Sequence, residues 1–156
     1  MTPAERATAV QRAASDPSVS AFVAASAGSG KTKLLVDRLL RLMLDGADPG
    51  RILCLTFTRA GAAEMAVRLR GRLGEWVTLD DAALDARLLD LDTAPSAELR
   101  TRARALFARV LDLPGGMRID TIHGFCQALL RRFPLEASLS PRFRLMEERD
   151  QRQLDG

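Results

Sequence analysis

The segment that most constrains the fold is residues 20–33, which reads SAFVAASAGSGKTK. Its apolar run at residues 21–24 predicts a buried strand. A loop of small residues follows the run, and beyond Lys31 and Thr32 the leucines recur at the spacing of an amphipathic helix. A strand, a small-residue loop and a helix in this order are typical of the phosphate-binding loop called Walker A.

Each residue type in this loop has a physical role in holding a nucleotide. Gly28 and Gly30 permit backbone dihedrals that aim successive N–H groups into one concavity. The N-terminal end of the helix adds positive potential at the same place. Lys31 would bridge the β- and γ-phosphates, and the Thr32 hydroxyl would bind Mg²⁺. The segment therefore predicts ATP and Mg²⁺ as ligands, held by Ala25, Ser26, Ala27, Gly28, Ser29, Gly30, Lys31 and Thr32.

The loop departs from the usual pattern at one position. Ala25 stands where the pattern usually has glycine, and this difference affects only the geometry of the turn. A glycine-containing turn without a ligand is the alternative, and the predicted strand before it and helix after it argue against that alternative.

The chain after this loop continues the alternation of helix and strand. The pattern predicts a helix over residues 31–45, a strand over 51–57 and a helix from there to about Leu73. The second strand is apolar almost throughout, which predicts burial on both faces. The order predicts an α/β fold with a parallel sheet flanked by helices.

Residues 74–113 change in character, and we interpret them as a helical insertion between strands of the main sheet. Helices are predicted over residues 80–89 and 98–113. The arginines of the second helix are interpreted as a solvated face, with phosphate contact as the alternative. Beyond the insertion, residues 117–123 predict a strand that leads directly into another helix, and residues 143–146 predict a short strand.

Polar and aromatic side chains stand at the predicted ends of two strands, where parallel sheets bind ligands. They are Phe57, Thr58 and Arg59 after one strand, and Thr121 and His123 after another. Hydroxyl and guanidinium groups can hold phosphates, and a phenyl ring can stack on a base. The residue types alone favour the structural alternative, in which Phe57 and His123 are buried and Arg59 is solvated.

Length and composition limit the class of protein to which this chain can belong. The chain has 156 residues, a length typical of one domain, with 47% hydrophobic and 28% charged residues. No apolar run is long enough to span a bilayer, and the polar N-terminal segment is unlike a signal peptide. Cys54 and Cys126 lie in apolar segments, which predicts reduced core thiols and, with the other features, a cytoplasmic location. The net charge of +3 decides nothing, and the single histidine suggests no metal site.

Four blocks in this order resemble the N-terminal motifs of superfamily 1 DNA helicases of the UvrD/Rep type. Gln11 resembles the Q motif, and an amide can match the donor and acceptor on the adenine edge. The other blocks are AASAGSGKT at 24–32, LTFTRAGAAEM at 55–65 and IDTIHGFCQALLRRFPLEA at 119–137. Their spelling is most similar to the AddA helicase–nuclease proteins, of which RecB is a near relative.

The resemblance implies a P-loop NTPase fold: residues 1–156 would be the N-terminal part of the first RecA-like domain, with the helical insertion at about 74–113. It implies that Gln11 reads adenine and that Lys31 and Thr32 act on the ATP phosphates and Mg²⁺. Single-stranded DNA would contact Phe57, Thr58, Arg59, Thr121 and His123. The implied activity is ATP-driven 3′–5′ unwinding in double-strand-break repair, together with a nuclease domain and an AddB-type partner.

The chain also departs from the family pattern. It has nothing similar to the Asp-Glu pair of the Walker B motif, and no second motor domain or nuclease region. We therefore expect an N-terminal fragment of a longer protein that cannot hydrolyse ATP efficiently alone. Two alternatives are a small P-loop phosphotransferase, with the arginines at 100–109 forming a lid, and an inactive truncated product that exposes apolar surface.

Overall fold

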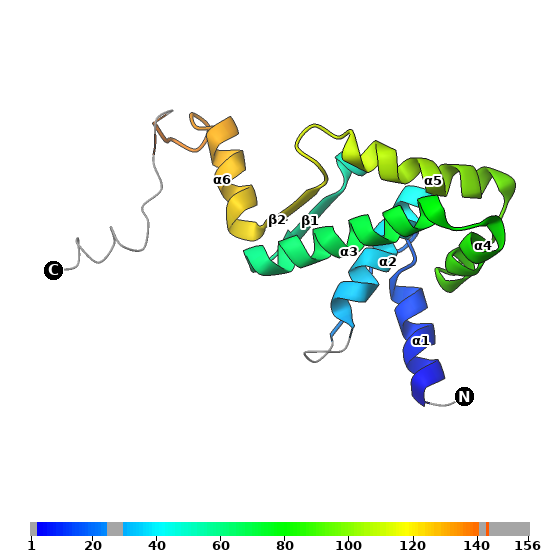
Figure 1. Ribbon diagram of the computed structural model, residues 1–156. Coiled ribbons are helices and arrows are strands. Elements are labelled where there is room, and N and C mark those ends of the chain that lie inside the picture. Colours follow the sequence, from blue (N-terminus) through cyan, green and yellow to red (C-terminus); the bar gives the residue numbers. More distant parts are fainter. Residues whose placement is uncertain (1–2, 25–29, 141–142, 144–156) are drawn as a thin grey trace.

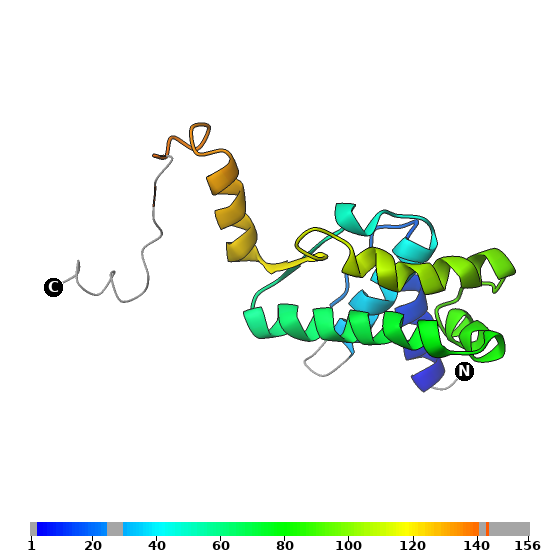
Figure 2. The same cartoon turned by 45° about the horizontal axis from the view of Figure 1, so that its top comes forward.

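The computed structural model describes residues 3–24, 30–140 and 143, which form a body of helices with a short parallel sheet at its edge (Figures 1 and 2). The helices are α1 (Pro3–Ala14), α2 (Lys31–Leu44), the 3-10 turn η1 (Pro49–Arg51), α3 (Arg59–Thr78), α4 (Asp81–Asp90), α5 (Ala97–Leu111) and α6 (Ile122–Arg132). The strands are β1 (Leu53–Thr56) and β2 (Arg118–Thr121).

The two strands run parallel, with Leu53 opposite Arg118 and Thr56 opposite Thr121. Helices α3, α4 and α5 make the long connection between them. Leu53 and Leu55 are exposed, whereas Cys54 is half-buried against the helical core. The predicted burial of this strand on both faces is therefore wrong, because the helices cover one face only.

The predicted strand at residues 21–24 is also wrong. These residues have no regular secondary structure and are exposed, and Phe22 is 96% accessible. A strand requires a neighbour to pair its N–H and C=O groups. In the described part of the chain, β1 and β2 pair with each other and no strand lies beside residues 21–24.

The core lies between α2, α3, α4 and α5. Its largest fully buried side chains are those of Trp76, Leu40, Met43, Leu44, Leu69, Leu73, Leu84, Leu88 and Leu106. Helix α5 turns Ala103, Leu106 and Val110 into this core, and Leu99 on the same helix and Leu113 just beyond it are half-buried. Helix α3 continues past Leu73 to Thr78, because Trp76 adds one more buried turn to its apolar face.

The arginines of α5 bind neighbouring segments, so their interpretation as a solvated face is wrong for three of them. Arg100 forms ion pairs with Asp81 and Asp85, and Arg104 binds Asp81 and the Leu79 carbonyl. Arg102 binds the Leu44 carbonyl and Glu98. These contacts tie α5 to α4 and to the end of α2, and they leave little freedom for a phosphate-binding lid.

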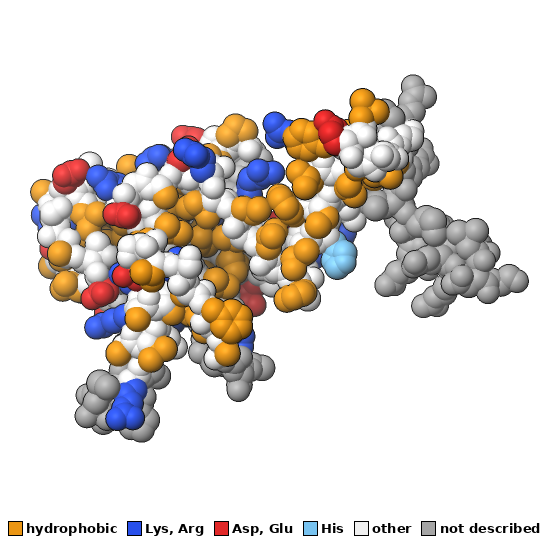
Figure 3. Space-filling view, turned by 180° about the vertical axis from the view of Figure 1, so that it is seen from behind, with side chains coloured by type: hydrophobic (Ala, Val, Ile, Leu, Met, Phe, Trp, Pro, Cys, Tyr) orange, Lys and Arg blue, Asp and Glu red, His pale blue; other side chains and the backbone are white. Residues whose placement is uncertain are grey.

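Apolar side chains gather on the face seen in Figure 3, where α6 extends from the end of the sheet. No residue of α6 is buried, although its apolar residues recur at helical spacing. Cys126 is exposed on this helix, so the prediction of a core thiol there is wrong, while Cys54 is half-buried and burial raises the pKa of its thiol. The strand predicted at 143–146 falls mainly outside the described residues.

No helix among the described residues is both long and apolar enough to cross a membrane.

Candidate functional site

The first candidate site is the N-terminal end of α2. Gly30 precedes this helix with φ of +83°, a left-handed conformation that glycine adopts without strain. Lys31 is exposed and Thr32 is half-buried in the first turn. Glycine has no side chain that could cap the first backbone N–H groups of α2. A helix start of this kind is suited to binding an anion. The predicted ligands Ala25, Ser26, Ala27, Gly28 and Ser29 lie outside the described residues.

Gln11 of α1 lies directly beside this helix start. A Cβ atom built on Gly30 would stand 3.6 Å from the Gln11 Nε2 atom. The structure thus brings together two residues that are far apart in the sequence and that the resemblance assigns to one nucleotide. A helix that begins after a glycine can hold phosphates, and an amide beside it can hold a base, so these residues fit ATP.

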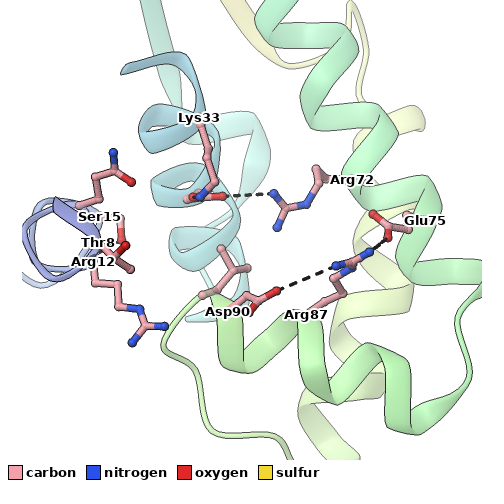
Figure 4. A pocket seen from close by; sticks show the side chains of 11 residues that line it. Thr8, Arg12, Ser15, Lys33, Arg72, Glu75, Arg87 and Asp90 are labelled. Carbon is pink, nitrogen blue, oxygen red and sulfur yellow. Dashed lines mark hydrogen bonds and ion pairs between the residues drawn. The ribbon is translucent and has the colours of Figure 1, made fainter. Parts of the chain in front are cut away.

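A cavity of about 480 Å³ opens between α1 and the helices opposite it (Figure 4). Thr8 and Arg12 line it from α1, and Arg72 and Glu75 line it from α3. Gln11, which lies beside Gly30, and Lys33 of α2 also belong to its lining.

The charged side chains that line this cavity from α2, α3 and α4 are paired with one another. The Asp37 carboxylate, which is buried on α2, accepts from Lys33 Nζ at 2.6 Å and from Arg72 Nη1 at 3.3 Å. Arg87 of α4 binds Glu75 at 2.7 Å and approaches Asp90 at 4.0 Å. Paired charges give a polar wall of low net charge, which suits an uncharged polar group better than a phosphate.

The second candidate site is the end of the sheet where β1 and β2 both stop. Because Thr56 pairs with Thr121, the segments after the two strands leave the sheet side by side (Figure 1). Phe57 is 85% accessible, and Arg59 and His123 are exposed. The structural alternative that placed Phe57 and His123 in the core is therefore wrong. His123 lies in the first turn of α6 and not in a strand.

Thr58 and Thr121 are the N-caps of α3 and α6. The Thr58 Oγ1 atom accepts from the Gly61 N–H at 3.0 Å, and Thr121 Oγ1 accepts from the Gly124 N–H at 3.0 Å. Such caps are worth about 1 kcal/mol each and fix where the helices begin. A capping hydroxyl keeps its own hydrogen for donation, so the exposed Thr58 can still donate to a phosphate oxygen, whereas Thr121 is buried.

No group of three or more metal-ligating side chains occurs among the residues that the structure describes.

The whole chain has a clear relationship to known proteins. Residues 7–155 match the UvrD/REP helicase N-terminal domain. The chain belongs to this family. Membership implies a P-loop NTPase fold, and the described part contributes a parallel pair of strands with helices around it.

Similar proteins are named as the A subunits of ATP-dependent helicase/nucleases, as the AddA-like motifs predicted. The Lactobacillus gasseri protein is 32% identical over 92% of this chain, and the Desulfitobacterium hafniense strain DCB-2 protein is 38% identical over 90%. The Bacillus pumilus protein is 36% identical over 81%. The chain spans only 10%, 9% and 9% of these relatives, respectively.

Sequence reasoning missed two arginines of this UvrD-type chain that hold α1 in place. Arg38 and Arg41 of α2 donate to backbone carbonyls at the end of α1 and just beyond it. Every residue has a backbone carbonyl, so the sequence does not mark these acceptors. The only available signal was that both arginines lie on one side of a predicted helix.

Proposed function

We propose that this chain is the ATP-binding and single-stranded-DNA-binding part of an ATP-dependent 3′–5′ DNA helicase of the helicase–nuclease type. The observation that carries this proposal is the pairing of Thr56 with Thr121, which puts the two predicted DNA segments at one end of the sheet. The family match over residues 7–155 and the names of the relatives support the same assignment.

The proposed domain is the N-terminal part of the first RecA-like domain, covering residues 1–156. Helices α4 and α5 lie within the proposed insertion at about 74–113, and α5 is tied back to α2 by Arg102. In a complete RecA-like sheet, further strands would pair beside the outer edges of β1 and β2.

Each residue of the proposed nucleotide site has one task. Lys31 places a positive charge on the β- and γ-phosphates, and Thr32 supplies a hydroxyl for Mg²⁺. Residues 25–30 contribute backbone N–H groups, and Gln11 holds the adenine edge. Bound Mg-ATP supplies the phosphoanhydride whose hydrolysis drives translocation. At the end of the sheet, Phe57 stacks on a base, while Thr58, Arg59, Thr121 and His123 bind the DNA backbone.

The wider role of the protein is also a proposal. We infer a place in double-strand-break repair and recombination, in the cytoplasm, with a nuclease activity and an AddB-type partner. The 156 residues lack an Asp-Glu pair of the Walker B kind, so we expect them alone to hydrolyse ATP very slowly. The phosphotransferase alternative is disfavoured because Arg100, Arg102 and Arg104 are already engaged within the insertion.

DNA binding tests this proposal through Phe57. We expect the chain to bind fluorescein-labelled oligo-dT in an anisotropy titration, and Phe57→Ala to weaken binding about tenfold through the loss of one stacked base. Phe133→Ala, which removes another exposed ring at the end of α6, is the matched control and should leave the affinity within about twofold of the wild type.

Equal affinity of both variants for oligo-dT would remove Phe57 from the proposed DNA site. A folded wild-type chain with no affinity at low salt would contradict the DNA-binding function of these residues.

A further inference from the structure

Helix α1 is held mainly by polar contacts. None of its described side chains belongs to the apolar core cluster, and most of them are exposed. Figure 1 shows it extending from the body of the molecule alongside α2. Polar contacts from α2 hold the end of α1, close to Gln11.

Arg38 of α2 supplies the first set of these contacts. Its Nη1 atom donates to the Ala14 carbonyl at 3.0 Å and to the Asp16 carbonyl at 2.6 Å, and its Nη2 atom donates to the Val19 carbonyl. Carbonyls at the C-terminal end of a helix lack partners within the helix, so a cation there satisfies them and complements the helix dipole.

Arg41, one turn further along α2, supplies the second set. Its Nη1 atom donates to the Arg12 carbonyl at 2.9 Å and to Ser15 Oγ at 2.8 Å. Ser15 is buried and donates in turn to the Arg12 carbonyl at 2.9 Å. The two arginines, here called the arginine clasp, thus fix the backbone of residues 12–19 against α2.

Gln11 immediately precedes this clasped segment, and its amide lies beside Gly30. The arginine clasp lies on the middle turns of α2, and Gly30 lies at the start of the same helix. The clasp therefore sets the distance between the Gln11 amide and the first turn of α2.

We propose that Arg38 and Arg41 are positioning residues that give the nucleotide site its preference for adenine, by fixing Gln11 where the base must lie. This inference rests on the proposed function, in which α2 holds the triphosphate. Affinity for the phosphates comes from the loop and Lys31, and discrimination between bases comes from the clasped α1. Loss of the clasp should therefore impair base selectivity and spare phosphate binding.

Lysine is an informative replacement at Arg38. It keeps the positive charge but presents one ammonium group in place of a planar fork, so it cannot reach three carbonyls in a fixed geometry. Arg102→Lys is the matched control, because Arg102 also donates to a backbone carbonyl, that of Leu44, at the other end of α2.

The test measures displacement of a fluorescent ATP analogue by ATP, GTP and inorganic tripolyphosphate. For Arg38→Lys we expect affinity for ATP to fall about tenfold, the preference for ATP over GTP to disappear, and affinity for tripolyphosphate to stay within about twofold. Gln11→Ala should give the same pattern, and the double variant should add nothing further. Arg102→Lys should retain the wild-type selectivity.

An equal fall in affinity for ATP and tripolyphosphate, or additive effects of Arg38→Lys and Gln11→Ala, would overturn this inference alone. A wild-type chain that binds neither ligand would overturn it together with the proposed function. Fluorescence of the single tryptophan, Trp76, reports whether each variant is folded. Arg41→Lys replaces Arg38→Lys if the latter does not fold, with the same outcomes.

Discussion

At the scale of single residues, Trp76 shows how packing and hydrogen bonding contribute differently. The side chain is fully buried between the helices of the core. Within the described residues its Nε1 atom has no hydrogen-bond partner. A buried donor without a partner costs free energy, and this cost offsets part of what the buried ring contributes.

We predict different outcomes for two substitutions of Trp76. Trp76→Phe keeps most of the apolar contact and removes the unsatisfied donor, so the free energy of unfolding should fall by less than about 1.5 kcal/mol. Trp76→Ala leaves a cavity and should cost about 3–5 kcal/mol. Urea unfolding followed by circular dichroism measures both values. A loss of similar size in the two variants would mean that the indole N–H has a partner in solution.

At the scale of elements, helices α4 and α5 are joined by ion pairs that the sequence did not reveal. Asp81 accepts from Arg104 Nη2 at 2.8 Å and lies 3.4 Å from Arg100 Nε. The hydrogen bond from Arg104 and the charges of both arginines hold the pKa of the Asp81 carboxyl below its usual range. Arg100 also donates a hydrogen bond to Asp85, and this bond raises the pKa of the Arg100 guanidinium.

The lowered pKa of Asp81 makes the stability of the fold depend on pH. A carboxyl whose pKa is lowered in the folded state stabilises the fold above its unfolded-state pKa, and this stabilisation is lost as the pH falls from about 5 toward 2. We expect Asp81→Asn to be less stable than the wild type at pH 7, and the difference to shrink at pH 3. Thermal unfolding at several pH values measures it.

Asp112→Asn provides the control, since it removes an exposed carboxylate at the end of α5. Its difference from the wild type should change less over this range. If the two variants lost the same stability at every pH, the pair between Asp81 and Arg104 would not be holding the carboxylate.

The elements also show which features were predictable from the sequence. Helices α2 and α5 were predicted within a few residues because their apolar spacing and flanking residues are local signals. Residues 21–24 were predicted wrongly because an apolar run becomes a strand only if a partner strand is present. The arginine clasp was missed because its acceptors are backbone carbonyls, which every residue possesses.

At the scale of the whole molecule, the fold brings together residues from distant motifs. Gln11 lies beside Gly30, and the parallel register places Phe57 and His123 at the same end of the sheet. The motifs predicted these two groupings through the resemblance to helicases, whereas the residue types alone favoured buried positions for Phe57 and His123. Exposure of both side chains removes that objection and leaves their contact with DNA as a proposal.

Nucleotide binding tests most directly whether the start of α2 binds the phosphates of ATP through Lys31. We would titrate the chain with a fluorescent ATP analogue in the presence of Mg²⁺. Lys31→Ala should weaken binding at least about tenfold, because it removes the charge that faces the phosphates. Arg109→Ala, which removes an exposed charge from α5, should leave binding unchanged. Equal affinity of both variants, or no binding by a folded wild-type chain, would contradict the account.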